Sequence, residues 1–331
     1  MKSSGIAIGL LALALAMPIA ATASATPEPS PSPTSQASPA SPAPPAAPDA
    51  SAGGFDVSKL TPAQQEALRL AIIKTSQNPV GNITIVPFQN NFNYGVGPYT
   101  RFQYILNVQP VIPIMLSTNM TLIARTIFPI INQPSAAPPL VCASPNGCPS
   151  TFGIGDMQEQ FFFAPKTKPG QLIWGVGPIF QAPTGSPSTL TSGKWSAGPD
   201  AVALIMPGKF VIGTLVTQLW SVAGPSSRPD LSVFFLQPFI NYNLKNGWAL
   251  STSPNITANW SAAQNRWAVP LGGGVARTFK DGDQLMSLAV SYYTYVTRPL
   301  GSPQTNLKIS WSLLWPVKRG IDIGQLLKEA Q

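Results

Sequence analysis

Residues 307–315 read LKISWSLLW, and this stretch decides the fold. One set of alternate positions holds Leu307, Ile309, Trp311, Leu313 and Trp315. The positions between them hold Lys308, Ser310, Ser312 and Leu314. Successive side chains of a β-strand point to opposite faces, so this segment has one apolar face and one mostly polar face. That pattern is typical of a barrel strand that separates lipid from a polar interior.

Two other segments repeat the same alternation. In residues 101–109 the apolar set is Phe102, Tyr104, Leu106 and Val108, and the polar set is Arg101, Gln103, Asn107 and Gln109. In residues 232–243 the apolar set is Phe234, Leu236, Ile240 and Tyr242, and the polar set is Gln237, Asn241 and Asn243. The period of two therefore extends well beyond the last strand.

Turn-forming residues divide the region into about twelve strands. The expected spans are 82–93, 100–115, 121–132, 152–164, 171–182, 194–206, 209–221, 231–244, 248–260, 266–279, 284–297 and 304–315. Short connections alternate with longer ones, of which 133–151 is the longest. Bacterial barrels have short periplasmic turns and longer outer loops. An even strand number with both termini in the periplasm fits this alternation.

Composition supports a membrane barrel. Only 10% of the residues are charged and 44% are hydrophobic, whereas soluble domains carry about 25% charged residues. After the N-terminus no apolar run approaches the roughly 20 residues of a membrane helix. A chain without such helices must satisfy its backbone hydrogen bonds in lipid by forming a closed barrel. The expected fold is an all-β, antiparallel transmembrane β-barrel over residues 75–316, with a short N-terminal helix.

The N-terminal region is expected to contain three segments. Residues 1–25 have the apolar core and small-residue cleavage site of a signal peptide, with an uncleaved anchor helix as the alternative. Residues 26–54 form a linker rich in Pro, Ser and Ala, which is disordered or contacts the cell wall. Residues 55–74 form a short periplasmic helix that starts near Thr61-Pro62. We expect this helix to lead into the barrel, and a plug is the alternative. Residues 317–331 form a C-terminal tail.

Aromatic residues and prolines give contrasting indications. Trp195, Trp220, Trp260 and Trp267 fall at the expected outer strand ends, and Trp174, Trp248 and Trp315 fall at the inner ends. Such positions match the two aromatic girdles of a membrane barrel.

Prolines within the expected strands are the main objection to the barrel prediction, because proline removes a ladder donor. We expect these prolines to mark bulges or bends.

The cysteines and the missing histidines limit the chemistry. Cys142 and Cys148 bracket a short loop segment, which suggests one disulfide in an exported chain. The chain has no His, so a Ser–His nucleophile is excluded and a metal site with two thiolates is poor. We expect no enzyme, no catalytic residue, no cofactor and no metal.

The polar strand faces supply candidate pore-lining residues. They are Arg101, Gln103, Asn107, Gln109, Arg125, Asp156, Gln237, Asn241, Arg277 and Lys308. Residues 75–316 contain 13 basic and 6 acidic residues, scattered rather than clustered as nucleic-acid binding would require. The excess suggests contact with anionic lipid headgroups or a lumen that favours anions. A salt-bridged, plugged interior is the alternative.

Several segments also resemble a bacterial family of outer-membrane transporter-like proteins that is often labelled neuromedin U. The family is similar to outer-membrane proteins of the MetA pathway of phenol degradation. The segments are Asn78-Pro79-Val80, VPFQNNFNYGVGP (86–98), LNVQPVIPI (106–114), RTIFPIINQP (125–134), GIGDMQEQFFFAP (153–165), LIWGVGPIFQAPT (172–184), SGKWSAGPDAVAL (192–204), LQPFINYNL (236–244) and SPNITANW (253–260). The resemblance covers about residues 75–316. It implies an outer-membrane channel-like barrel and supplies no catalytic or binding residues.

The functional expectation is passive passage of small solutes, aromatic or anionic, across a Gram-negative-type outer membrane. The expected partners are outer-membrane lipid and the solutes, with cell-wall contact through the linker and no nucleic acid. The alternative is a non-conducting structural or adhesive barrel linked to the cell wall.

Overall fold

The computed structural model describes residues 61–137, 148–168, 170–282 and 284–316. One helix precedes a single antiparallel sheet of fifteen strand segments. The elements are α1 (Pro62–Ser76), β1 (Ile83–Val96), β2 (Arg101–Val108), β3 (Val111–Met115), β4 (Met120–Gln133), β5 (Thr151–Ile154), β6 (Gln158–Pro165), β7 (Ile173–Gln181), β8 (Trp195–Ile205), β9 (Phe210–Ala223), β10 (Ser232–Asn243), η3 (Lys245–Gly247), β11 (Trp248–Thr252), β12 (Ile256–Asn259), β13 (Trp267–Asp281), β14 (Gln284–Thr297) and β15 (Thr305–Pro316).

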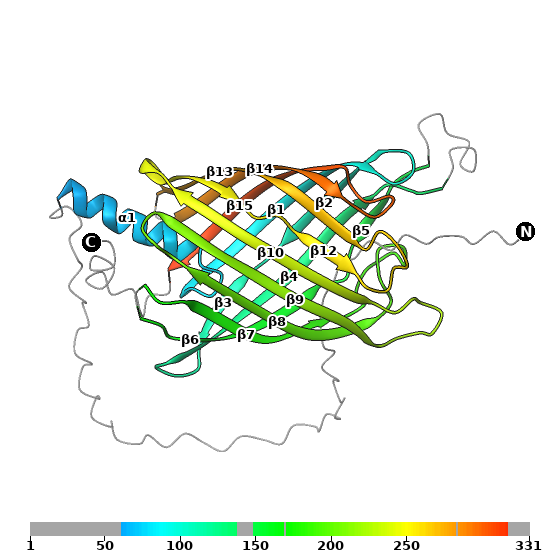
Figure 1. Cartoon of the computed structure of the whole chain (residues 1–331), viewed down its shortest axis with the longest axis horizontal. Coiled ribbons are helices and arrows are strands. Elements are labelled where there is room, and N and C mark those ends of the chain that lie inside the picture. The colour runs from blue at the N-terminus through cyan, green and yellow to red at the C-terminus, as the bar shows by residue number, and fades with distance from the viewer. Residues whose placement is uncertain (1–60, 138–147, 169, 283, 317–331) are drawn as a thin grey trace, which may run out of the picture.

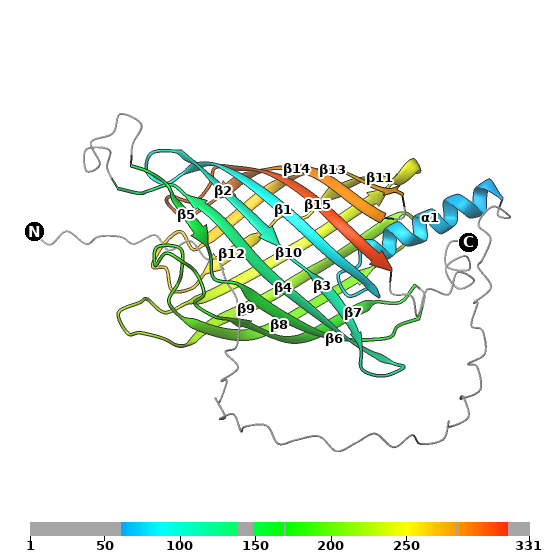
Figure 2. The ribbon, with the colours of Figure 1, turned by 180° about the vertical axis from the view of Figure 1, so that it is seen from behind.

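The sheet closes on itself. The last strand, β15, pairs with β1 along its whole length, from Ile83↔Pro316 to Tyr94↔Thr305, and Figure 2 shows the two strands side by side. Three pairs of segments are halves of interrupted strands (β2 with β3, β5 with β6, β11 with β12), so the barrel has twelve strands. A closed sheet leaves no unpaired edge in lipid. The predicted fold class is confirmed, and each of the twelve predicted spans overlaps one barrel strand.

The two ends of the barrel differ. Helix α1 and the end of β15 lie at one end, here called the α1 end (Figure 1). Turns at this end are short, such as 206–209 between β8 and β9. Connections at the opposite end, here called the loop end, are mostly longer, such as 182–194 between β7 and β8. The predicted alternation of connection lengths is therefore confirmed.

Some prolines interrupt the ladder, as predicted, whereas Pro113 lies in a strand whose pairing with β4 continues without a shift. Pro110 separates β2 from β3, and Pro254 lies in the break between β11 and β12. At Pro270 the register of β13 against β14 shifts. A proline has no N–H to donate, so a break or bulge removes the need for that hydrogen bond. The gap beside Pro110 is bridged locally, because the Gln109 N–H donates to the Pro87 carbonyl at 2.9 Å.

The outward face is apolar and ends in aromatic residues. All eight tryptophans are 38–47% exposed, so none packs in the interior. Trp195 and Trp267 begin strands at the loop end, whereas Trp248 begins β11 and Trp174 is the second residue of β7 at the α1 end. Rings at both levels form the girdles that flank the lipid-facing band of a barrel. The prediction that tryptophans mark the two membrane interfaces is consistent with these positions.

Helix α1 is fastened to the α1 end. The Lys74 ammonium donates to the carbonyls of Met206 (2.8 Å) and Gly208 (3.0 Å) in the β8–β9 turn. The Gln77 amide donates to the Asn243 side chain at 2.9 Å. The helix starts at Pro62 as expected and continues to Ser76, slightly beyond the predicted end. None of the described helices is long and apolar enough to cross a membrane.

Four predicted segments are not covered. The signal peptide, the linker and the C-terminal tail lie outside the described residues, as do the first six residues of the predicted helical segment 55–74. They stay predictions.

Candidate solute pathway in the barrel interior

The strand register identifies the interior face. Directly paired residues on neighbouring strands point to the same side of a sheet. Asn93 pairs with Asn306 on one side and Gln103 on the other, and all three are buried. Counting in steps of two from these positions assigns the interior side chains of the neighbouring strands. Nine of the ten candidate pore-lining residues lie on this interior face: Arg101, Gln103, Asn107, Gln109, Arg125, Asp156, Gln237, Asn241 and Lys308.

The assignment of Arg277 to the lumen was wrong. Arg277 pairs with Trp248 on β11 and with Leu288 on β14, and both partners are exposed on the outer face. Its guanidinium lies 5.3 Å from the centroid of the Trp248 ring. Alternation along β13 is regular, with Trp267, Leu271 and Val275 exposed, so counting in steps of two also places Arg277 on the outer face. Arg277 is an interfacial cation that stacks on a girdle tryptophan.

The interior is filled on one side of the barrel. A cluster of inward side chains from β3, β4, β6 and β8–β10 packs around Val80, which follows α1. The cluster comprises Val80, Val111, Ile123, Phe162, Ala164, Val202, Leu204, Val211, Leu215 and Phe239. It occupies the α1 end of this half. The segment after α1 thus contributes an apolar side chain to the barrel interior, in addition to leading into β1.

A polar network continues the filled half toward the loop end. The Arg125 guanidinium donates to the side-chain oxygens of Gln160 (3.0 Å) and Gln109 (2.7 Å). The Gln160 amide donates in turn to Asp200, which also accepts from the Thr217 hydroxyl at 2.9 Å. Gln160, Asp200 and Thr217 are buried. The network therefore sets one positive against one negative charge across the part of the sheet from β4 to β9.

The opposite side is lined by small side chains. The interior positions of β13, β14 and β15 include Gly274, Ala276, Ser287, Ala289, Ser310 and Ser312. All six are half-buried rather than buried. Their neighbours on β1 and β2 are Gln89 and Asn107, which are also half-buried. Such short side chains fill less of the interior next to this wall than the large side chains of the filled half do. We call β13, β14 and β15, which carry these six positions, the small-residue wall.

The α1 end of the small-residue wall becomes apolar. Leu314 on β15 pairs with Ile85 on β1 and with Leu285 on β14, so the three share the interior face. Leu314 and Ile83 are buried. Ile85 also packs against the cluster that contains Val80, and we call Val80, Ile83, Ile85, Leu285 and Leu314 the apolar collar. An apolar constriction resists wetting and can act as a gate.

The loop end carries two polar anchors. The first is Asp156, which is fully buried and accepts from Gly185 N–H (3.0 Å), Ser192 N–H (2.7 Å) and the Ser192 hydroxyl (2.6 Å). These bonds hold the connection 182–194 to the segment between β5 and β6. Asp156 and Glu159 do not face one another, because Glu159 pairs with Thr126 on the outer face. The pair is therefore no acid–base couple.

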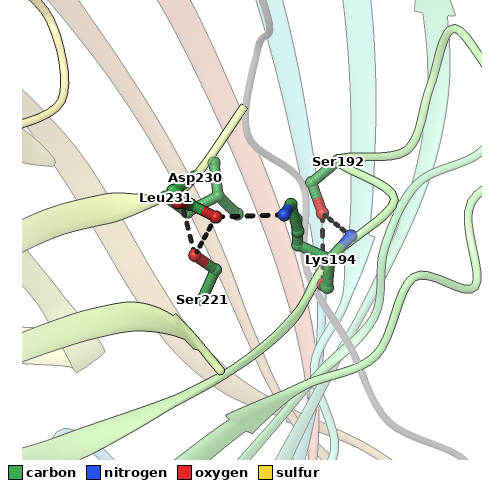
Figure 3. A network of polar contacts seen from close by, with 5 residues as sticks. All are labelled: Ser192, Lys194, Ser221, Asp230 and Leu231. Carbon is green, nitrogen blue, oxygen red and sulfur yellow. Dashed lines mark hydrogen bonds and ion pairs between the residues drawn. The ribbon is translucent and has the colours of Figure 1, made fainter. Parts of the chain in front are cut away.

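The second anchor links two loops (Figure 3). The buried Lys194 ammonium lies 3.0 Å from a carboxylate oxygen of Asp230, which is exposed. The Ser221 hydroxyl donates to the same carboxylate at 3.2 Å. Hydrogen bonds from Lys194 and Ser221, and the Lys194 charge, lower the pKa of Asp230. Residues of both loops and of β9 line a shallow recess of about 380 Å³ here.

The cysteine prediction is tested in part. Cys148 is disulfide-bonded and buried, and its carbonyl accepts from Arg101. Cys142 lies outside the described residues, so its pairing with Cys148 stays a prediction. Among the residues that the structure describes, no group of acidic, Cys or His side chains could hold a metal ion.

Sequence reasoning missed the partners of the interior charges. Asp200 follows Pro199 in the run GPDAVA, which has no alternation to mark its face. Tyr293 belongs to the aromatic run SYYTY, in which both faces carry tyrosine. Only the register shows that Tyr293 faces inward and Tyr292 outward. Both residues stand out by their type, but assigning them to the interior face requires the pairing between distant strands.

Comparison with solved structures agrees with the fold. An outer membrane channel from Pseudomonas putida F1 superposes with a TM-score of 0.52 at 14% identity, over 70% of this chain and 94% of that one. The NanC porin gives 0.45 at 8% identity, over 70% and 100%. Outer membrane phospholipase A from Escherichia coli gives 0.40 at 12% identity, over 70% and 92%. The sequence matches no family model and no curated protein. Identities this low show a shared barrel fold alone.

Proposed function

We propose that the chain is an outer-membrane channel for the passive passage of small solutes, with both termini in the periplasm. The small-residue wall carries this proposal. A barrel built only for structure gains stability when its interior is packed. Here one half holds the apolar cluster and the Arg125 network, and the other keeps Gly, Ala and Ser at six of its interior positions. The resemblance to transporter-like proteins points the same way, and no catalytic role is proposed.

The apolar collar makes the proposed passage a gated one. Val80 is placed by α1, which is held at the barrel end through Lys74 and Gln77. Loosening α1 frees Val80 to leave the interior cluster. The α1 segment is then the movable part of the channel, while the polar network and the small-residue wall stay fixed.

Liposome swelling tests the channel. Vesicles that contain the refolded full chain should swell when small sugars or amino acids are added outside. The double variant K74A/Q77A should swell faster, because both side-chain anchors of α1 are removed. Ser310→Trp should slow the swelling, because it places a large ring on the interior face. Ile309→Trp, its outward neighbour on β15, is the matched control and should swell like the unaltered chain.

The alternative is a structural barrel linked to the cell wall through its linker. It predicts no swelling above empty vesicles for the full chain and for K74A/Q77A, with both proteins folded and inserted. That result would overturn the channel proposal.

A further inference from the structure

One interior cation differs from the others in its surroundings. Lys308 is the fourth residue of β15 and lies on the small-residue wall, where it is only 7% exposed. Its ammonium donates to the Ser253 carbonyl (2.9 Å) and the Ser253 hydroxyl (3.2 Å). It also lies 4.8 Å from the centroid of the Tyr293 ring. These contacts orient an ammonium without neutralising it.

The remaining interior charges are compensated or lie at strand ends, as Arg101 and Lys280 do. Arg125 is linked through Gln160 to Asp200 in the filled half. Asp156 is fully buried and enclosed by the donors that hold the 182–194 connection. Arg101 is the first residue of β2 and so lies at the loop end. Within the described part of the chain, Lys308 forms no ion pair with a carboxylate.

The neighbours of Lys308 are arranged to assist a bound anion. An ammonium has three donors, and two of the Lys308 donors are used by Ser253. Lys308 pairs directly with Ser291 on β14 and with Asn91 on β1, so both side chains share its interior face. The same register continues to Ser251 through Gly274. The hydroxyls of Ser291 and Ser251 next to this cation can donate hydrogen bonds, whereas the Asn91 amide donates to the Gln89 and Ile105 carbonyls.

We propose that Lys308 makes this channel anion-selective and that its preferred solutes are small monocarboxylates. This inference rests on the proposed channel function. A single ammonium with hydroxyl neighbours matches one carboxylate. A phosphate dianion is more often held by several cations or by a bidentate guanidinium, and the Lys308 environment supplies neither.

Reversal potentials in planar bilayers test the selectivity. The refolded full chain should pass chloride in preference to potassium across a potassium chloride gradient. Lys308→Gln should lower the chloride-to-potassium permeability ratio about fivefold, the Boltzmann factor for one unit charge acting across about 4 Å of water. Lys308→Arg should keep the ratio. Arg277→Gln removes one positive charge from the outer face of the same barrel and should leave the ratio unchanged.

Benzoate and benzyl alcohol test the solute class. Benzoate added to both sides should reduce the chloride current of the unaltered chain and of Arg277→Gln, and should have little effect on Lys308→Gln. Benzyl alcohol, the uncharged analogue, should reduce none of the three currents. Should Lys308→Gln not fold, Ser291→Asp serves instead, because it places a carboxylate directly opposite Lys308 and should lower the ratio in the same way.

The outcomes separate this inference from the channel proposal. If neither the full chain nor K74A/Q77A conducts, the channel proposal itself fails. If current flows but prefers cations, or if Lys308→Gln and Ser291→Asp both leave the ratio unchanged, the role of Lys308 is wrong while the channel stands. If the current is anion-selective but benzoate does not compete, the monocarboxylate assignment is wrong.

Discussion

Replacing Arg125 by Met tests whether the buried polar network stabilises the barrel. The variant keeps an unbranched side chain of similar length and removes the guanidinium. Asp200 then stays in the interior without the positive charge that compensates it, and Gln109 and Gln160 each lose a donor. A hydrogen bond to a charged group contributes about 1.5–3 kcal/mol. Removing one partner of a buried charge pair costs about 3–5 kcal/mol in all. We expect Arg125→Met to lower the free energy of unfolding by that amount.

A double-mutant cycle separates the charge effect from the loss of packing. Asp200→Asn in the Arg125→Met background removes the uncompensated carboxylate, so it should recover about 1–2 kcal/mol, within the usual range for coupled neighbours. The measurement is urea unfolding of the refolded protein in detergent micelles, followed by tryptophan fluorescence. Arg277→Met is the matched control. It removes an exposed contact with a tryptophan ring and should cost less than about 1 kcal/mol.

Two results would refute the reasoning. Arg125→Met could unfold within about 1 kcal/mol of the unaltered chain, which would mean that water or relaxation solvates Asp200 without the guanidinium. Alternatively, the two substitutions could be strictly additive, which would show that Arg125 and Asp200 are not coupled through Gln160.

Three further predictions concern other parts of the barrel. The pKa of Asp230 is lowered in the folded state, so its stabilising effect is present above the ordinary Asp pKa and is lost as the pH falls through the lowered value. The difference in melting temperature between the unaltered chain and Asp230→Asn should therefore shrink from about pH 7 to about pH 3. Tyr104→Phe removes the hydroxyl that donates to Asn90 on the outer face and should cost about 1–3 kcal/mol in urea unfolding, unlike Tyr292→Phe on the same face; equal effects would contradict this. Gly213→Val puts a Cβ 2.5 Å from the Phe239 ring and 2.6 Å from the Ala203 carbonyl, so the free energy of unfolding should fall by about 1–3 kcal/mol; an unchanged value would show that β9 shifts to make room there.

The sequence predicted the strands well because their determinants are local. The alternation in residues 307–315 assigned Lys308 to the interior and Trp311 to the outside, as the register shows. Helix α1 was found from Thr61-Pro62 for the same reason. Lengths of turns and loops also follow from local composition, so the number of strands needed no long-range information.

The site was predicted less completely because it depends on pairing between strands. Arg277 was placed inside because it was grouped with the other basic residues, although the alternation of β13 from Trp267 onward places it outside. Asp200 and Tyr293 were missed because their contacts, Gln160 and Lys308, come from other strands. The position of Val80 depends on how α1 is held by the β8–β9 turn and β10. Residue types alone indicate which side chains face the barrel interior, but not which half of that interior is packed.

The division of the barrel into a packed half and a small-residue wall has a consequence for re-engineering the protein. Side chains on β14 and β15 can be enlarged or given charge without entering the apolar cluster and the Arg125 network, which lie on other strands. The pore diameter and the stability of the folded barrel should then be adjustable independently, as a nanopore for sensing requires.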